Sequence, residues 1–273
     1  MNIATNPMHL KVTTTYDAAA DHFDDPCLDF WQRHGRRTIE QLALRPGSRV
    51  LDVGCGTGAS ALPAARAVGP TGHVTGIDLS ENMLARARAK AVANGIDNVT
   101  FAVADMTALD GSSVRYDAIV SVFSIFFVPD MARQIAALWR LLQPGGQLAI
   151  TVWGPGAMEP AAGVFGEEVR RVRPDIPVAG RPWERLTAPE NFRRLLQDAG
   201  TTTPKLRVFA DKQPLWQAAD WWTIAMGSGY RWEIDQLTPE QRKTVHRRTI
   251  DRLTDMDVHK IETGALAATA RKT

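Results

Sequence analysis

A glycine-rich loop near residue 50 is the part of this chain best suited to chemistry. The segment Val50-Leu-Asp-Val-Gly-Cys-Gly-Thr-Gly58 starts as a strand-like apolar run, and a helical pattern follows it. Glycine has no Cβ, so its backbone can pass close to a ligand. A helix that begins after such a loop presents unpaired N–H groups and a partial positive charge. The loop therefore predicts a binding site for an anionic group.

Three acidic residues accompany the loop. Asp52 stands two residues before the first glycine, Asp78 follows the second strand-like run, and Asp105 follows the third. An acid at the end of the second strand can accept hydrogen bonds from the two hydroxyls of a ribose. The loop and its acids therefore indicate a cofactor that contains a nucleoside.

Two cofactor classes compete at this point. The spacing Gly54-x-Gly56-x-x-Ala59 loosely matches the dinucleotide fingerprint, which permits alanine at its third position. That match would predict a nicotinamide-dependent oxidoreductase. The third glycine at Gly58, the extra acids at either end of the pattern and a later Leu142-x-Pro-Gly-Gly146 favour S-adenosylmethionine (SAM) instead.

Strand-like and helical patterns alternate through the first half of the chain. Ser80 and Asp130 are suited to cap two of the helices, because their side chains can accept hydrogen bonds from free N–H groups. This alternation predicts βαβ units and a parallel sheet. The predicted strands are 49–53, 73–77, 99–103, 117–123 and 148–153, and the predicted helices are 59–68, 81–94 and 131–142.

The pattern loosens after Gly154. Two capping boxes, Thr187 to Glu190 and Thr238 to Gln241, predict helix starts, the first helix ending near Ala199. Pro144-Gly-Gly146 predicts a sharp turn before the fifth strand. The remaining predictions are a strand over 206–209, a helical and aromatic region over 214–256, and a final strand over 261–270.

The motifs as a set resemble those of the class I SAM-dependent methyltransferases, over about residues 45–154. The resemblance is closest to the branch that includes ubiquinone/menaquinone-biosynthesis methyltransferases and many natural-product methyltransferases. The segments that carry it are Leu51-Asp-Val-Gly-Cys-Gly-Thr-Gly58, Gly76-Ile-Asp-Leu-Ser80, Ala104-Asp-Met106, Tyr116-Asp-Ala-Ile-Val120 and Leu142-Gln-Pro-Gly-Gly146.

This resemblance implies an α/β fold, with a Rossmann-like, doubly wound and mostly parallel sheet. The antiparallel C-terminal strand would lie at the sheet edge, and helical insertions would lie on the substrate side. We expect one domain over 1–273, subdivided into a helical lid (1–44), a SAM-binding core (45–154), insertions (155–186 and 211–259) and the final strand (260–273).

The resemblance also implies roles for single residues. The glycines would wrap the methionine part of SAM, Asp52 would help to hold its ammonium, and Asp78 would bind the ribose. Asp105 would accept from the adenine amino group, apolar side chains would pack on the adenine, and Ser121 would lie beside the sulfonium. The predicted cofactor-binding residues are Tyr16, Asp52, Gly54, Cys55, Gly56, Gly58, Asp78, Leu79, Met83, Ala104, Asp105, Met106 and Ser121.

The chain departs from many relatives at Phe126-Phe127, where they carry two histidines. The substrate side is therefore expected to be more apolar, and any help from those imidazoles is absent. The segment from Tyr16 to His34 has the composition of an amphipathic lid, with aromatic residues on one side and acids on the other. No catalytic base stands out, and the weak candidates are His22, His34 and Tyr16.

Five of the eight tryptophans lie between Trp183 and Trp232. Aromatic side chains can line a pocket for a flat or apolar acceptor, and they can also simply pack the inserted helices. The candidate substrate-pocket residues are Trp31, Phe126, Trp183, Trp221, Trp222 and Tyr230.

Composition narrows the function further. The net charge is +2, which argues against binding driven by nucleic-acid phosphates, although one helical stretch from Arg242 to Arg252 is basic. Two cysteines are too few for a disulfide framework, no Cys/His spacing suggests a metal site, and no apolar run could span a bilayer. Met1 to Thr15 lacks the apolar core of a secretory signal. We expect a cytoplasmic enzyme that methylates an oxygen, nitrogen or carbon atom of a small apolar or aromatic acceptor, such as a phenol, quinol or carboxylate of a secondary metabolite, and releases S-adenosylhomocysteine.

Three alternatives remain open on the sequence. An RNA or protein methyltransferase would need a broad charged groove or an added recognition domain, and neither is visible. A non-catalytic SAM-fold scaffold would show degenerate glycines or lack Asp78, whereas these residues are intact. A nicotinamide-dependent oxidoreductase is disfavoured by the motif set. The acceptor, the atom that is methylated and the oligomeric state do not follow from the sequence.

Overall fold

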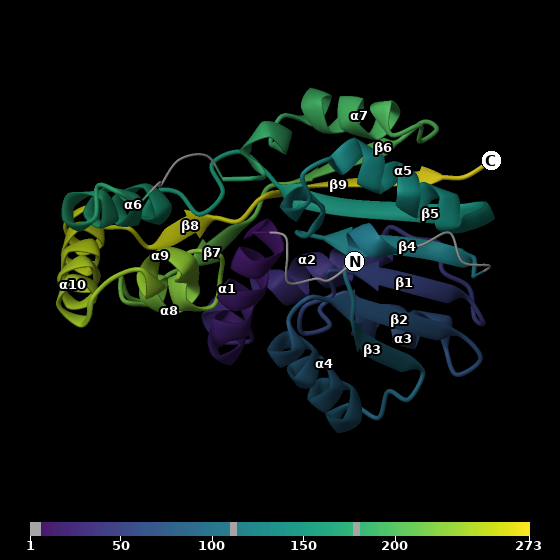
Figure 1. Ribbon diagram of the computed structural model, residues 1–273, viewed down its shortest axis with the longest axis horizontal. Helices are drawn as coiled ribbons and strands as arrows, with labels where there is room; N and C mark the ends of the chain where they lie inside the picture. The colour runs from purple at the N-terminus through teal and green to yellow at the C-terminus, as the bar shows by residue number, and fades with distance from the viewer. Residues whose placement is uncertain (1–6, 110–113, 177–180) are drawn as a thin grey trace.

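A seven-stranded sheet forms the centre of the molecule, in a computed structural model that describes residues 7–109, 114–176 and 181–273. The strands lie in the order β3-β2-β1-β4-β5-β9-β6, as Figure 1 shows from bottom to top. All neighbours among the first five are parallel, and β9 is antiparallel to both β5 and β6. The strands are β1 Arg49–Val53, β2 His73–Asp78, β3 Val99–Val103, β4 Tyr116–Val122, β5 Leu142–Trp153, β6 Lys205–Phe209 and β9 Ala265–Arg271.

The predicted doubly wound, mostly parallel α/β fold is confirmed. The strand order reverses between β1 and β4, which is where ligands bind in sheets of this kind. Alternate side chains of each strand face opposite layers, because the side-chain period of a strand is two. Leu51 and Ile119 enter one apolar core, whereas Val50 and Val120 enter the other.

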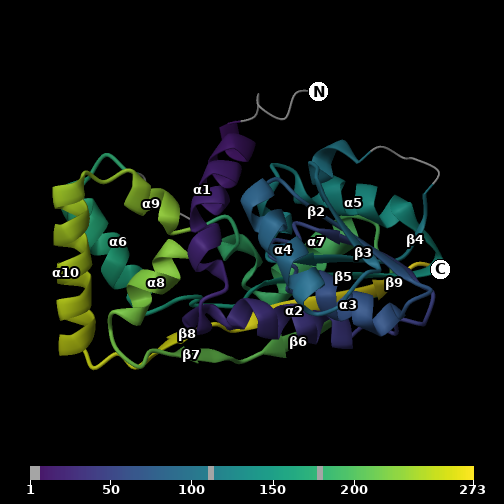
Figure 2. The same cartoon turned by 90° about the horizontal axis from the view of Figure 1, so that it is seen from below.

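Helices cover both faces of the sheet, as the second view shows (Figure 2). α2 and α3 pack with the core that contains Val50, and α5 and α7 pack against the opposite face. α1 lies across the end of the sheet and contacts α4, α8 and α9. The helices of this part are α1 Pro7–Phe23, α2 Phe30–Glu40, α3 Ala61–Val68, α4 Glu81–Ala93, α5 Met131–Leu141 and α7 Pro189–Asp198, with 3-10 turns η2 Pro26–Leu28, η3 Met106–Ala108, η4 Ile125–Phe127 and η5 Glu184–Leu186.

A second group of helices lies beside the sheet, beyond α1 (Figure 1). Trp221 is fully buried there and packs edge-on against Phe165 and Tyr230. Arg252 joins α10 to α6 by ion pairs with Glu167 and the buried Glu168, both 2.8 Å long. The group consists of α6 Ala161–Val172, α8 Asp220–Met226, α9 Arg231–Asp235 and α10 Pro239–Asp255.

The C-terminal strand differs from the prediction in two ways. β9 lies between β5 and β6 rather than at the sheet edge, because β6 pairs with its outer side. The predicted strand over 261–270 is also split at Thr263-Gly264. Its first part is β8 Lys260–Glu262, which pairs with β7 Lys212–Pro214 in a separate two-stranded sheet.

Two local predictions are wrong as well. The turn predicted at Pro144-Gly-Gly146 lies inside β5, in an irregular stretch near the start of the strand. Gly145 there has a φ of +79°, and its N–H donates to the Lys272 carbonyl. The box at Thr187 does not cap α7. Pro189 is its first residue, so Ala188 takes the cap position, and the Thr187 hydroxyl donates to the Glu184 carbonyl instead. The box at Thr238 is confirmed.

Candidate functional site

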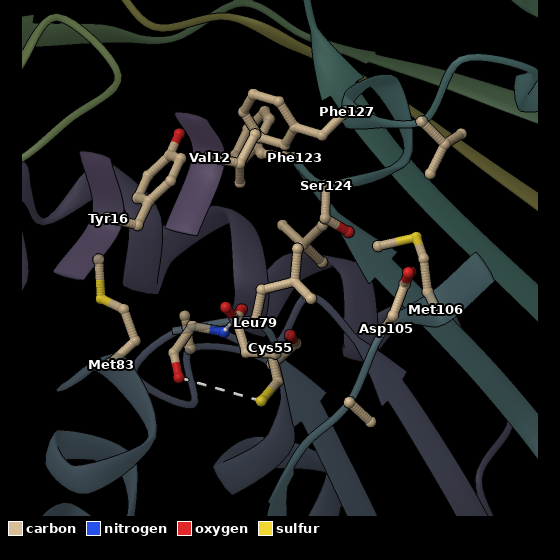
Figure 3. A pocket seen from close by; sticks show the side chains of 18 of the residues that line it. Val12, Tyr16, Cys55, Leu79, Met83, Asp105, Met106, Phe123, Ser124 and Phe127 are labelled. Carbon is tan, nitrogen blue, oxygen red and sulfur yellow. Dashed lines mark hydrogen bonds between the residues drawn. The ribbon is translucent and has the colours of Figure 1, made fainter. Parts of the chain in front are cut away.

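A cavity opens where β1, β2, β3 and β4 end, under α1. Figure 3 shows Tyr16 and Phe127 across the cavity from Leu79 and Cys55, with Asp105 and Met106 to one side. Its position is the switch point of the sheet, so several strand ends supply residues to it. The lining residues are His9, Val12, Tyr16, Phe23, Trp31, Gly54, Cys55, Gly56, Ala59, Ser60, Asp78, Leu79, Met83, Ala104, Asp105, Met106, Val122, Phe123, Ser124, Phe127 and Val128.

Ten of the thirteen predicted cofactor residues therefore line one cavity, and three do not. Gly58 faces away from the cavity: a Cβ there would lie 3.2 Å from Leu62 and 3.5 Å from Ala87, so its role is close packing at the start of α3. Ser121 is fully buried, and Asp52 lies beneath the loop. The ten are Tyr16, Gly54, Cys55, Gly56, Asp78, Leu79, Met83, Ala104, Asp105 and Met106.

Gly54 could not be another residue in this loop. Its φ is +68°, which side chains with a Cβ rarely adopt, and a Cβ there would lie 2.3 Å from Cβ of Ser124. Such a clash cannot be relieved by a rotamer change, because both atoms are fixed to the backbone. The segment after β4 therefore packs directly against the glycine loop at Ser124, and only glycine at position 54 permits this close contact.

Asp52 is the buried acid beneath the loop. Its Oδ2 accepts a 2.6 Å hydrogen bond from Ser60 Oγ, whereas Oδ1 has no partner among the described residues. Burial raises the pKa of Asp52 to about 7, a shift that the Ser60 hydrogen bond opposes and the nearby charge of Asp78 increases. A buried acceptor without a partner is costly unless a ligand completes it.

Asp78 ties β2 to the loop. Its Oδ2 accepts from the Gly56 N–H at 2.9 Å, and Oδ1 accepts from the Ser80 N–H at 3.0 Å. Burial raises the pKa of Asp78, although these backbone hydrogen bonds pull it down. Each carboxylate oxygen retains a second lone pair, so the side chain can still accept from a ligand hydroxyl.

Asp105 contacts both its own turn and the lid. Its Oδ1 accepts from the Thr107 N–H at 2.7 Å, and its Oδ2 lies 3.2 Å from Nδ1 of His9 on α1. Both side chains are about nine-tenths buried. The first turn of α1 therefore reaches the end of β3, a contact that links the lid to the predicted adenine end of the cavity.

α1 presents one face to the cavity and contacts α4 with the other. His9, Val12, Tyr16 and Phe23 line the cavity at helical spacing. On the other face, Asp17 accepts from Ser80 Oγ at 2.5 Å at the start of α4, where the helix dipole favours an acid. Two ion pairs of 2.7 Å also reach α4. They join Asp21 to Arg86 and Asp24 to Lys90.

Aromatic rings build the end of the cavity above β4 and β5. Phe123 has φ +54°, an uncommon backbone state for a bulky residue, and its ring stacks on Trp153 at 4.0 Å. Trp31 stacks on Phe23 at 4.9 Å. Its indole Nε1 is buried and has no hydrogen-bond partner among the described residues. This end therefore offers one unpaired donor in an otherwise apolar wall.

Ser124, rather than Ser121, reaches the cavity after β4. The two hydroxyls lie 2.7 Å apart, and Ser124 Oγ donates to the Val53 carbonyl at 2.7 Å. The positive φ of Phe123 turns the chain between them, and a phenylalanine gives no sequence signal for such a turn. The other lining residues that the sequence analysis missed are His9, Val12, Ala59, Ser60, Val122, Phe123 and Val128.

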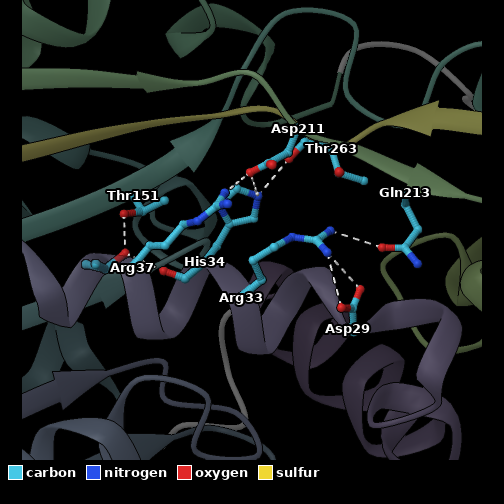
Figure 4. A network of polar contacts seen from close by, with 9 residues as sticks. Asp29, Arg33, His34, Arg37, Thr151, Asp211, Gln213 and Thr263 are labelled. Carbon is cyan, nitrogen blue, oxygen red and sulfur yellow. Dashed lines mark hydrogen bonds and ion pairs between the residues drawn. The ribbon is translucent and has the colours of Figure 1, made fainter.

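None of the three candidate bases is suited to take a proton in this cavity. His34 is fully buried away from it, with Nε2 2.7 Å from the Thr263 carbonyl, beside Arg37 and Asp211, which form an ion pair (Figure 4). Burial lowers the pKa of His34 to about 4. His22 lies in the last turn of α1 and does not line the cavity. Tyr16 lines it, but burial and the charge of Asp78 raise the pKa of its phenol, so the phenol stays protonated.

The candidate substrate aromatics fall into three places. Trp31 lines the cofactor cavity. Trp183 and Tyr230 line a second cavity, which Phe126 approaches through a ring contact of 5.5 Å with Trp183. Trp221 and Trp222 line neither cavity. They are consecutive on α8, and their rings pack on Phe165 and His246 respectively. Both rings therefore pack α8 against its neighbouring helices, α6 through Phe165 and α10 through His246.

Comparisons with known proteins agree with this geometry. A methyltransferase-domain family model matches residues 50–146. Aklanonic acid methyltransferase of Streptomyces sp. (strain C5) is 33% identical over 141 residues, 52% of this chain and 64% of that protein. Nocamycin O-methyltransferase of Saccharothrix syringae is 29% identical over 253 residues, 88% of this chain and 89% of that protein. The match therefore spans less than two thirds of the first relative and most of the second.

A solved structure supports the fold alone. The chain is similar to a methyltransferase structure from Bacillus halodurans C-125, with a TM-score of 0.58, 20% identity, and coverage of 88% of this chain and 99% of that chain. The matched domain, the relatives and the sheet order confirm the family resemblance of the motifs. Residues 50–146 of this chain form a methyltransferase domain, which resembles those of the class I SAM-dependent methyltransferases in its motifs and its sheet order.

Proposed function

We propose that this chain transfers the methyl group of SAM to an oxygen, nitrogen or carbon atom of a small apolar or aromatic acceptor. The observation that carries the proposal is the cavity at the switch point, which combines apolar aromatic walls with a few polar side chains and with Trp31, whose Nε1 has no partner among the described residues. Small-molecule sites have this character, since apolar walls give contact area and single polar groups fix orientation. The names of both relatives, which refer to small molecules, support it.

The buried polar atoms suit the two charged groups at the amino-acid end of SAM, and other side chains suit its ribose and adenine. An amino-acid end carries an ammonium, which needs an acceptor, and a carboxylate, which needs a donor. Asp52 Oδ1 is a buried acceptor without a partner, and Trp31 Nε1 is a buried donor without one. Asp78 is placed to hold ribose hydroxyls. Leu79, Met83 and Met106 supply an apolar surface for the adenine, beside Asp105.

Methyl transfer needs alignment more than proton chemistry. When bound, SAM would supply a methyl group whose carbon is attacked in line by a lone pair of the acceptor, while the carbon–sulfur bond breaks and S-adenosylhomocysteine leaves. The chain positions the partners and keeps water out, because α1 covers the cavity and the rings of Phe123 and Trp31 form its wall. Aromatic faces also favour a cationic group next to them.

The three predicted bases favour acceptors that lose their proton without help from them. Tyr16 keeps its phenol proton because burial raises its pKa, and His34 and His22 lie outside the cavity. A general base is needed only when the acceptor must be deprotonated in the transition state. A phenol, quinol or carboxylic acid would release its proton to water before the transfer and react as the anion.

The wider setting is part of the same proposal. No helix within the described ranges is long and apolar enough to cross a membrane. The two cysteines are buried and unpaired, which supports a location in the cytoplasm. We also propose the division into a lid over 1–44, a cofactor core over 45–154, insertions over 155–186 and 211–259, and a final segment over 260–273.

Calorimetric titration with SAM and, separately, with NADH tests the cofactor. We expect micromolar binding of SAM, no binding of NADH, and loss of SAM binding in Asp78→Ala. Transfer of labelled methyl groups to a panel of phenols, quinols and carboxylates then tests the acceptor class. Binding of NADH but not SAM, or transfer only to RNA or protein, would refute the proposal.

A further inference from the structure

A second cavity lies next to the cofactor cavity and differs from it in character. The loop after β5 and the start of α6 form one side, and the segment around η5 together with Tyr230 forms the other. Glycines at 154, 156, 163 and 166 line it, so little side-chain bulk fills its first side. The large side chains around it are Glu159, Arg170, Arg181, Trp183, Glu184 and Tyr230.

Arg181 is the most constrained charge in this cavity. Its Nη1 donates to Glu233 Oε1 at 2.7 Å, and its guanidinium lies 4.1 Å over the ring of Tyr230. The side chain is 20% exposed, while those of Glu233 and Tyr230 are almost fully buried. A guanidinium has five N–H donors, and among the described residues Glu233 is its one hydrogen-bond partner. The stacked ring fixes its plane, so a rigid edge with free donors remains at the cavity.

The other charges around Arg181 leave room for an anion. Glu159 accepts from the Gly163 N–H at 3.1 Å at the start of α6, so its charge is engaged there. Glu184 is exposed to water, and Arg170, also exposed, forms no ion pair with the described residues. The buried carboxylate of Glu233 is attracted by both Arg181 and Lys11. Glu159 and Glu184 match Arg170 and Arg181 in number, so a preference of this cavity for an anion depends on the free N–H donors of Arg181 and not on an excess of positive charge.

A thin wall of rings separates this cavity from the cofactor site. Tyr16 lines the cofactor cavity, and its hydroxyl lies 3.6 Å from the place that a Cβ on Gly229 would take, next to Tyr230. On the other side, Phe127 of the cofactor cavity contacts Phe126 at 4.8 Å, which in turn contacts Trp183 at 5.5 Å. Phe126 and Phe127 therefore stand between Trp183 and the cofactor cavity on this side, and an acceptor held in the second cavity must extend past these rings to reach the methyl group.

We propose that this second cavity binds the anionic end of the methyl acceptor, a carboxylate carried on a flat aromatic frame. The free edge of the Arg181 guanidinium would hold the carboxylate, since that planar fork matches a carboxylate in two parallel hydrogen bonds. Trp183 and Tyr230 would flank the ring. The proposal rests on the function proposed above and narrows its acceptor class to anions.

A matched pair of probes tests the charge preference. 2-Naphthoate and 2-naphthamide share a flat frame and differ in charge, and each is titrated into the protein saturated with S-adenosylhomocysteine. We expect naphthoate to bind about tenfold more tightly than the amide, as one charge-assisted hydrogen bond pair allows. Equal binding of the two probes to the wild-type protein would overturn the proposal.

Variants then assign the preference to Arg181. Arg181→Met should bring naphthoate binding down to that of the amide, whereas Arg185→Met, an exposed arginine outside both cavities, should leave it unchanged. Because Arg181→Met leaves the buried Glu233 without its partner, the double variant with Glu233→Gln is the second test, and the same loss is expected. Retention of the preference in the double variant overturns the proposal.

The same titrations separate this proposal from the one on which it rests. Failure of S-adenosylhomocysteine to bind the wild-type protein would refute the proposed methyltransferase function itself. Binding of S-adenosylhomocysteine together with no preference for naphthoate would refute only the anionic acceptor.

Discussion

Trp31 and Trp221 allow a direct comparison between the cofactor side and the helical side of this molecule. Both tryptophans are buried, and both have an indole N–H without a partner among the described residues. Trp31 lines a cavity, whereas Trp221 is enclosed by Phe165 and Tyr230. The same chemical group thus lies beside a cavity in one region and within packed side chains in the other. Burial and an unpaired donor indicate a binding role only where a cavity lies next to them.

Gly54 should give the largest effect on the cofactor side. Gly54→Ala adds a Cβ at 2.3 Å from Ser124, so the loop must move and SAM affinity should fall by about 100-fold, as expected for a clash of 2–3 kcal/mol. Calorimetric titration measures the change. Gly95→Ala is the control, because Gly95 has a similar φ of +61° with nothing within 4 Å of the added Cβ. It should lower stability by about 1 kcal/mol and leave SAM affinity alone. Equal loss of affinity in both variants would mean that backbone strain, not the clash, decides.

The paired tryptophans provide the next test. Trp31→Phe keeps an aromatic ring and removes the N–H, so affinity for S-adenosylhomocysteine should fall about 30-fold, near the value of a hydrogen bond to a charged group. Affinity for 5′-methylthioadenosine, which lacks the carboxylate, should not change. Trp221→Phe should change neither affinity, because Trp221 lies outside the cavity. If Trp31→Phe weakens both ligands equally, its role is packing.

The cofactor side was predictable because each motif residue follows a strand, and parallel strands end at one edge. Gly54, Asp78 and Asp105 are far apart in the sequence, yet the sheet order brings β1, β2 and β3 side by side. The helical spacing of Tyr16 and Phe23 also placed both on one face of the lid. His9 and Val12 continue that spacing toward the N-terminus, and the same reasoning could have found them.

The helical side was not predictable from local pattern. Trp221 and Trp222 are adjacent, so a helix directs them to different neighbours, and only the docking of α6 and α10 decides which is enclosed. Arg181 gained its place from Glu233 and Tyr230, which are about 50 residues away on another element. Such contacts between inserted elements leave no periodic signal in the sequence.

Asp52 predicts a pH dependence of cofactor binding. Its pKa of about 7 means that the carboxyl is mostly protonated at pH 6 and mostly ionised at pH 7.5. The ionised form attracts the ammonium of the cofactor, so affinity for S-adenosylhomocysteine should rise roughly eightfold over this interval. Titrations of the wild-type protein and Asp52→Asn at several pH values measure it. A slope that persists in Asp52→Asn would assign the titration to another group.

The smallest expected effect is a change of stability with pH, to which Asp52 and His34 contribute with opposite signs. His34 lies outside the cofactor cavity, with its Nε2 next to the Thr263 carbonyl. The folded-state pKa of His34 is lowered to about 4, so between pH 6.5 and 4 the unfolded chain binds a proton that the folded chain does not, and stability falls as the pH falls. Asp52 acts oppositely, because its raised pKa makes the folded chain bind the extra proton below pH 7. The two contributions nearly cancel in the wild-type protein.

In a variant that lacks Asp52, the pH dependence of stability caused by His34 should therefore become measurable. In Asp52→Asn, the free energy of unfolding in urea should fall by about 1 kcal/mol between pH 6.5 and 5.5, since the unfolded histidine titrates with its ordinary pKa in this range. Adding His34→Gln, whose amide can still donate to the Thr263 carbonyl, should remove this dependence. A double variant that keeps the slope would assign the pH dependence to a group other than His34.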